Sequence, residues 1–222
     1  MPSPKALFWR YHLLFVVAVC AILIAVAYCA AVILLVNIRT VGQARTALAS
    51  DWIHIRATDL SGWQKCALIT VQDPGFYENP GVRHAFRIAF KNTTIEQIVL
   101  RELHFADYKP GITGTIQMMA ACDALDRFVS KDDQLTLFIN AASFGRNLGG
   151  KPIKGFAAAA NAYFNKSFAQ LSGKEYLSLA AMLIDPAHLD PRTHSRENAE
   201  RQASFKDILI GRCSASTEMS GQ

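Results

Sequence analysis

The chain has 222 residues and a formal net charge of +5, and 51% of its residues are hydrophobic. Its Lys and Arg residues are scattered, with no basic helix, no interleaved aromatics and no zinc-ligand spacing, which excludes the common nucleic-acid-binding classes. The mild basicity fits an anionic membrane surface or an anionic substrate. The length allows one domain with a real core beyond any N-terminal anchor.

The first feature along the chain is an apolar run from Leu13 to Val36, which holds 24 residues and no charge. A helix of that length spans about 36 Å, enough to cross a hydrocarbon core of ~30 Å. A buried core helix would carry a polar stripe. A cleavable signal peptide has a shorter apolar region and a small-residue cleavage site. We therefore expect a tail over 1–12, an uncleaved transmembrane anchor over 13–36 and a linker over 37–50.

The charges beside this run do not fix its orientation. Lys5 and Arg10 precede it and Arg39 and Arg45 follow it, so the positive-inside rule gives nearly a tie.

Beyond residue 50 the patterns predict a domain over 51–212 that is all-α, followed by a short tail over 213–222. Strand-like alternation is nearly absent, and Ser61 and Ser130 are expected to cap helices. The glycine-rich stretch from Gly145 to Gly155 is expected to be a connecting loop. The expected helices begin near 60 and cover about 82–91, 94–104, 115–127, 131–140, 155–164, 172–184 and 195–211.

Three cysteines lie outside the apolar run: Cys66, Cys122 and Cys213. Their odd number and the lack of a CxxC pair predict neither a disulfide framework nor a metal site. We expect Cys66 and Cys122 to be small buried hydrophobes.

The second half contains an ordered set of short motifs. They are Ser130-Lys131 with a helix ending at Asn140, Phe144-Gly145, GFAAAA from Gly155, YFNK ending at Lys166, and Glu175, AAML, Pro186 and Asp190-Pro191. The set resembles the family 51 glycosyltransferases, which are the lipid II polymerase domain of bifunctional penicillin-binding proteins and the monofunctional transglycosylases. That family reads SKxxILExYLN, FG, GxxAAAxxYFxK and LxLxEAAxLAxLxxxP in the same order.

The first half agrees with the family in part. Residues 72–81 (QDPGFYENPG) resemble its first motif, EDxxFxxHxG, with Asp73, Phe76 and Gly81 identical. Its second motif, GGSTITQQLxKN, is matched at best by the stretch Thr113-Gly114-Thr115-Ile116-Gln117. The resemblance covers most of residues 52–210.

The resemblance implies a lysozyme-like, all-helical fold with a small hydrophobic jaw near the membrane. Family members join lipid II to a growing lipid-linked glycan and release undecaprenyl pyrophosphate. The glutamate of EDxxF is the general base. A second glutamate, in an RKxxE motif, lies near the donor, where basic side chains and sometimes a divalent metal offset the pyrophosphate charge.

The same resemblance implies a location and partners. The domain is expected on the periplasmic or external side of the bacterial cytoplasmic membrane. The implied partners are the bilayer, lipid II or glycan strands, and cell-wall synthases. No cofactor and no metal site is indicated by the residues themselves.

The catalytic positions depart from the family pattern. Gln72 occupies the general-base position, and an amide cannot accept a proton near neutral pH. Asn79 replaces the motif's histidine, and Thr136 replaces the glutamate of SKxxILE. With the second motif at Thr113–Gln117, the interval to Ser130 is about 18 residues short and RKxxE has no counterpart. An alignment that keeps the helix before Ser130 places Met118 at the second glutamate.

Four acids are candidate substitutes for the missing base: Glu78, Glu96, Glu102 and Asp107. Their positions match the turn or the variable jaw of the family, and we interpret them as solvated helix-face charges.

The remaining motif residues have two interpretations each. Lys131 matches the family's donor-side lysine but is also an ordinary residue for a first helical turn. Asn140 and Lys166 match structural or substrate-side positions. By resemblance, the substrate-binding candidates are Phe76, Asn79, Thr113, Thr115, Gln117, Lys131, Asn140 and Lys166, beside Gln72 and Asp73 at the catalytic position.

These observations favour a membrane-anchored family 51 homologue with little or no polymerase activity, a pseudoenzyme of cell-wall biogenesis. The alternatives are an active lipid II polymerase with a non-standard base, and a scaffold that binds lipid-linked glycan or a synthase.

Overall fold

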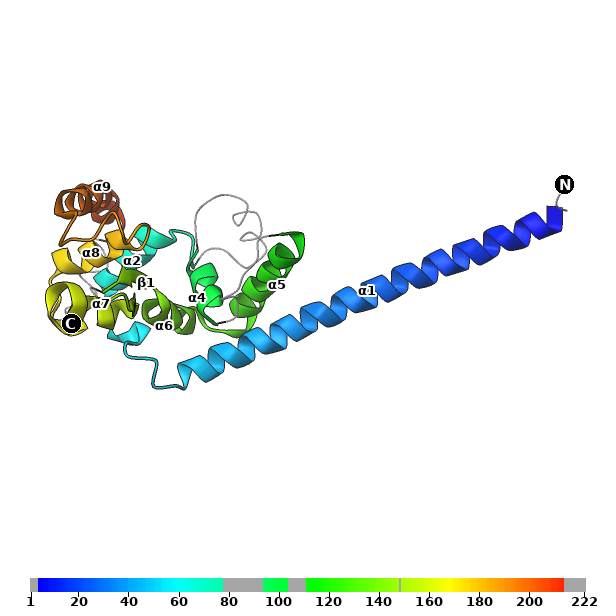
Figure 1. The fold of residues 1–222 in the computed structure, drawn as a ribbon, viewed down its shortest axis with the longest axis horizontal. Coiled ribbons are helices and arrows are strands. Elements are labelled where there is room, and N and C mark those ends of the chain that lie inside the picture. Colours follow the sequence, from blue (N-terminus) through cyan, green and yellow to red (C-terminus); the bar gives the residue numbers. More distant parts are fainter. Residues whose placement is uncertain (1–3, 78–93, 104–110, 148, 214–222) are drawn as a thin grey trace.

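The computed structural model describes residues 4–77, 94–103, 111–147 and 149–213. This part of the chain is mainly helical, as the sequence predicts (Figure 1). The helix expected over 82–91 lies outside it. The elements are α1 (Pro4–Leu48), η1 (Ala57–Asp59), α2 (Gly62–Gln72), α4 (Ile95–Leu103), α5 (Ile112–Phe128), α6 (Lys131–Ala141), β1 (Ser143–Arg146), β2 (Pro152–Lys154), α7 (Gly155–Phe164), η2 (Phe168–Gln170), α8 (Gly173–Met182) and α9 (Ser195–Cys213).

Helix α1 is one continuous rod that projects from the domain and touches it only near its C-terminal end (Figure 1). The candidate span, His12–Leu48, has an 18-residue window with mean hydropathy 3.0, and none of that window is buried in the protein. The helix continues through residues 37–48, where Thr40 and Ala44 are buried. Because this end packs against α4, α5 and α6, the apolar rod is held at a fixed angle to the domain.

Helix α6 is the centre of the core, since its residues from Gln134 to Ala141 are all buried. The amide of Asn140 ties it to the segment before η1. Its Oδ1 accepts from the backbone N–H groups of His54 (2.9 Å) and Ile55 (3.2 Å), and its Nδ2 donates to the carbonyls of Ile55 (2.7 Å) and Thr136 (2.8 Å). Both lone pairs and both N–H groups of this amide are therefore used within the fold.

The helix starts follow the predicted capping chemistry. The hydroxyl of Ser61 accepts from the N–H of Gln64 at 3.1 Å, and that of Ser130 accepts from the N–H of Asp133 at 3.1 Å. Both bonds satisfy a backbone donor that the helix itself leaves unpaired.

The stretch from Gly145 to Gly155 differs from the expected loop, because much of it is a small hairpin. Strands β1 and β2 pair antiparallel, with Ser143 opposite Lys154. Strands of three or four residues are too short to show alternation in a sequence. Gly155 ends the hairpin with a φ of +77°, and a Cβ there would lie 2.8 Å from the carbonyl oxygen of Asn140. Only glycine allows α7 to approach α6 this closely.

The expectation for Cys66 is wrong, because the structure joins it to Cys213 in a disulfide, with the two Cα atoms 5.7 Å apart. The pairing was hidden by 147 residues of separation and exists because α9 packs back against α2. Cys122 is free and buried, as expected.

Candidate active site

The first family motif forms the turn that follows α2. Gln72 is the last residue of the helix and is partly exposed, and Asp73 is its C-cap. The N–H of Asp73 donates to the carbonyl of Ile69 at 2.8 Å, and the N–H of Phe76 donates to the carbonyl of Asp73 at 3.0 Å. Asp73 is 2% exposed and Phe76 is fully buried, so this turn is anchored in the core and leaves Gln72 at its edge. Asn79 lies outside the described residues.

Lys131 brings this turn together with the SK motif. Its Nζ lies 4.4 Å from the centre of the Phe76 ring, a cation–π distance. The same Nζ donates to Asp126 Oδ1 at 2.6 Å and to Glu96 Oε1 at 2.9 Å. The ammonium is thus held by the turn after α2, the start of α4 and the end of α5. Lys131 is therefore more than an ordinary surface residue.

The carboxylates that hold Lys131 are buried. The side chain of Glu96 is 0% exposed, that of Asp126 is 6% exposed, and that of Lys131 is 23% exposed. Burial lowers the pKa of Lys131, but the charges and hydrogen bonds of Glu96 and Asp126 outweigh it, so the pKa is raised overall. Burial, followed by the charges of Glu96 and Asp126, raises the pKa of the neighbouring Cys122 thiol. With both carboxyls ionised this cluster carries a net charge of −1, and with one protonated it is neutral.

Glu96 is the residue that sequence reasoning misjudged, since it is neither solvated nor part of a variable surface. The missed signal is the stretch from Thr94 to Arg101 (TIEQIVLR), which matches STITQQLxK at Thr94, Ile95 and Gln97. In this alignment Glu96 occupies the place of a family threonine. We therefore reassign the second motif from Thr113–Gln117 to the start of α4, where the structure places it beside the SK lysine.

This reassignment removes the apparent deletion. Thr94 lies 21 residues before Thr115, so the interval to Ser130 regains the length that the other alignment lacked. This length agrees with the alignment that keeps the helix before Ser130, which assigns Met118 to the position of the second glutamate. Met118 is 3% exposed in the middle of α5.

The residues that the earlier alignment assigned to the second motif, Thr113 to Gln117, lie along α5. Thr113 is in its first turn, and the hydroxyl of Thr115 donates to the carbonyl of Gly111 at 2.9 Å. Gln117 follows, partly exposed, one residue before Met118.

Two motif residues are held by contacts within the fold. Asn140 uses its amide to fix the segment at His54 and Ile55, as described above. The Nζ of Lys166 donates to both carboxylate oxygens of Glu175, at 2.7 and 2.9 Å. The same carboxylate accepts from the N–H of Ser172, in a capping box at the start of α8. These contacts favour the structural interpretation of Asn140 and Lys166.

Among the remaining acids, Glu102 is paired with Lys154. Glu78 and Asp107 lie outside the described residues. Thr136, at the place of the SKxxILE glutamate, accepts from the N–H of Ala57 at 2.9 Å and donates to the carbonyl of Asp132 at 2.8 Å. Within the described ranges, no group of three or more His, Cys, Asp or Glu side chains is arranged to hold a metal ion.

The Glu175 contacts give a prediction for acid stability. The hydrogen bond from Lys166, and then that from the Ser172 backbone, lower the pKa of Glu175 from its ordinary value of 4.5 to about 2. A depressed carboxyl pKa stabilises the folded state above the unfolded value, and this contribution is lost as pH falls from 4.5 toward about 2. We expect the thermal midpoint of the wild type to fall more steeply than that of Glu175→Gln over this range. Parallel curves would contradict this assignment.

Comparison with known proteins identifies the family. The transglycosylase family model matches residues 39–209. Penicillin-binding protein 1F of Bacillus subtilis is 28% identical over 157 residues, covering 65% of this chain and 21% of the relative. Penicillin-binding protein 1A of Mycolicibacterium smegmatis is 30% identical over 159 residues, covering 65% and 20%.

A shorter relative, the biosynthetic peptidoglycan transglycosylase of Salmonella paratyphi A, is 28% identical over 166 residues, covering 69% of this chain and 65% of the relative. The chain thus spans about a fifth of the two penicillin-binding relatives and somewhat less than two thirds of the transglycosylase. The family model covers most of the chain, including the turn after α2 and the cluster around Lys131. The chain belongs to the transglycosylase family, the family 51 peptidoglycan glycosyltransferases.

Proposed function

We propose that this protein is a membrane-anchored pseudoenzyme of peptidoglycan biogenesis, which binds lipid-linked glycan and does not polymerise it. One observation carries the proposal. The donor-side lysine, Lys131, is neutralised by Glu96 and Asp126, while the general-base position holds the amide of Gln72.

On the acceptor side, the general-base position holds an amide. The amide of Gln72 can donate and accept hydrogen bonds, but it cannot take the proton of a sugar hydroxyl. The neighbouring carboxylate, Asp73, is 2% exposed and cannot reach a bound sugar in this conformation. Losing a general base alone costs about 10²–10⁴-fold in rate.

On the donor side, the charge of Lys131 is matched by carboxylates. A leaving pyrophosphate develops negative charge, which basic side chains stabilise in an active enzyme. Here the ammonium of Lys131 already makes two charge-assisted hydrogen bonds, to Glu96 and Asp126. Among the residues that the structure describes, both halves of the reaction thus depart from the family mechanism at one group each.

The anchor and its orientation are also part of the proposal. The apolar α1 supports a single span, and the disulfide between Cys66 and Cys213 supports a domain on the oxidising, periplasmic or external side. Structural disulfides form in oxidising compartments and are rare in the bacterial cytosol.

The test separates the effect of the amide at Gln72 from the effect of the carboxylates around Lys131, with lipid II assays on the full-length protein in bilayers. Gln72→Glu alone is expected to form no more glycan than the wild type, because the charge of Lys131 stays neutralised. Gln72→Glu with Glu96→Thr, which places the family residue at both positions, is expected to bind lipid II roughly tenfold more tightly than Gln72→Glu because one negative charge is removed.

A matched control is Gln72→Glu with Glu102→Gln. This variant removes a carboxylate from the same helix, but one that pairs with Lys154 and not with Lys131. It should bind lipid II like Gln72→Glu. Polymerisation at a normal rate by Gln72→Glu alone would show that the charge cluster does not limit the donor side.

A further inference from the structure

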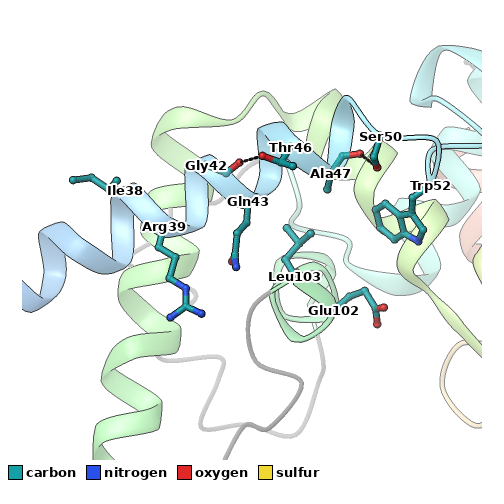
Figure 2. A pocket seen from close by; sticks show the side chains of 10 residues that line it. All are labelled: Ile38, Arg39, Gly42, Gln43, Thr46, Ala47, Ser50, Trp52, Glu102 and Leu103. Atoms are coloured by element: carbon teal, nitrogen blue, oxygen red, sulfur yellow. Dashed lines mark hydrogen bonds between the residues drawn. The ribbon is translucent and has the colours of Figure 1, made fainter.

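A second candidate site lies where α1 meets the domain. A groove of about 550 Å³ runs between the C-terminal part of α1 and α4. It shares no lining residue with the cluster around Lys131. Figure 2 shows Arg39 and Gln43 extending from α1 toward α4, with Trp52 at one end. The residues that matter for its chemistry are Arg39, Thr46, Ser50, Trp52 and Glu102.

The end of the groove that Arg39 lines corresponds, in its position along α1, to the headgroup layer of a membrane. Arg39 comes three residues after Val36, the last residue of the apolar run, and therefore lies about 4.5 Å beyond it. The headgroup layer on each side of a bilayer is roughly 5–8 Å thick. The rest of the groove extends away from the bilayer along α1.

Among its lining residues that the structure describes, the groove presents one cation outside any ion pair and several acceptors. Arg39 is exposed and forms no ion pair with any other residue that the structure describes. Glu102 also lines the groove, but its charge is matched by Lys154. The hydroxyl protons of Thr46 and Ser50 are donated to the backbone carbonyls of Gly42 (3.0 Å) and Ala47 (2.7 Å). These two hydroxyls therefore offer only lone pairs to a ligand.

We propose that this groove binds one membrane phospholipid with a single negative charge and a hydroxyl-bearing headgroup, of the phosphatidylglycerol type. Arg39 donates to the phosphodiester, and the headgroup hydroxyls donate to Thr46 further from the bilayer centre. The order of these groups along α1 matches the order of phosphate and hydroxyl in such a lipid. The inference rests on the proposed membrane anchor, but not on the loss of polymerase activity.

The experiment uses the full-length protein reconstituted in bilayers that contain phosphatidylglycerol and phosphatidylcholine in equal amounts. Flotation first shows whether the protein is in the bilayer. Mild detergent extraction and native mass spectrometry then count the lipids that stay bound. The variants are Arg39→Gln and, as a control, Arg45→Gln, which removes an equally exposed arginine of α1 that does not line the groove.

We expect the wild type and Arg45→Gln to retain one phosphatidylglycerol in preference to phosphatidylcholine. Arg39→Gln should lose this preference by about tenfold, because the phosphate of phosphatidylcholine is already offset by its own ammonium group and gains less from the guanidinium than the phosphate of phosphatidylglycerol does. Equal retention of both lipids by the wild type, or equal loss in both variants, would overturn the inference. Failure to float would instead refute the anchor.

Discussion

Replacing Lys131 with methionine is expected to destabilise the domain by about 3–5 kcal/mol. The ammonium pairs with two carboxylates whose side chains are 0% and 6% exposed, Glu96 and Asp126. Its removal takes away the positive charge that these two buried groups share, which costs far more than a surface ion pair contributes. Chemical denaturation of the full-length protein in detergent measures the change.

Two further variants make this result interpretable. Lys65→Met removes another lysine that pairs with α6, through Asp132, but this pair is largely exposed, at 27% and 57%. It should cost no more than about 1 kcal/mol. Adding Glu96→Gln to Lys131→Met should recover part of the loss, because it removes one of the two buried negative charges that Lys131 offsets. If Lys131→Met costs no more than Lys65→Met, the buried cluster does not stabilise the fold as we describe.

Removing the disulfide is expected to cost about 2–5 kcal/mol of stability. The bond between Cys66 and Cys213 closes a loop that contains most of the domain, with 147 residues of separation. A cross-link over a long loop restricts the unfolded chain strongly and so raises the stability of the folded state. We expect dithiothreitol to lower the denaturation midpoint of the wild type and to leave that of a Cys66→Ala, Cys213→Ala double variant unchanged.

The redox state of the same bond indicates on which side of the membrane the domain lies. Cells lysed in the presence of a thiol-alkylating reagent should yield protein labelled after unfolding at the free cysteines Cys20, Cys29 and Cys122, with Cys66 and Cys213 blocked. Cys122→Ala is the control, since it removes a thiol that forms no disulfide. Labelling of Cys66 and Cys213 as well would place the domain in a reducing compartment and contradict the proposed orientation.

Much of the fold could be predicted because its signals are local. The capping serines Ser61 and Ser130, the apolar run from Leu13 and the order of the second-half motifs each depend on residues a few positions apart. Such patterns fix helix starts and the hydrophobic face without tertiary information. The replacement of the general base by Gln72 was visible for the same reason.

The parts that were missed depend on long-range contacts. The resemblance places Glu96 in the variable jaw, which predicts a solvated charge, and only packing against α6 shows that its carboxylate is buried beside Lys131. The disulfide required the return of α9 to α2. The short strands β1 and β2 exist through pairing with each other, and neither is long enough to show a period.

The most direct test of the central claim is lipid II polymerisation by the wild-type, full-length protein in bilayers, with lipid II binding measured on the same samples. The account predicts that lipid II binds and that no glycan chains form, because Gln72 cannot act as a base and Lys131 is already neutralised. Glycan chains from the wild type, abolished by a Gln72→Ala substitution or not, would contradict it and show that another group supplies the missing chemistry.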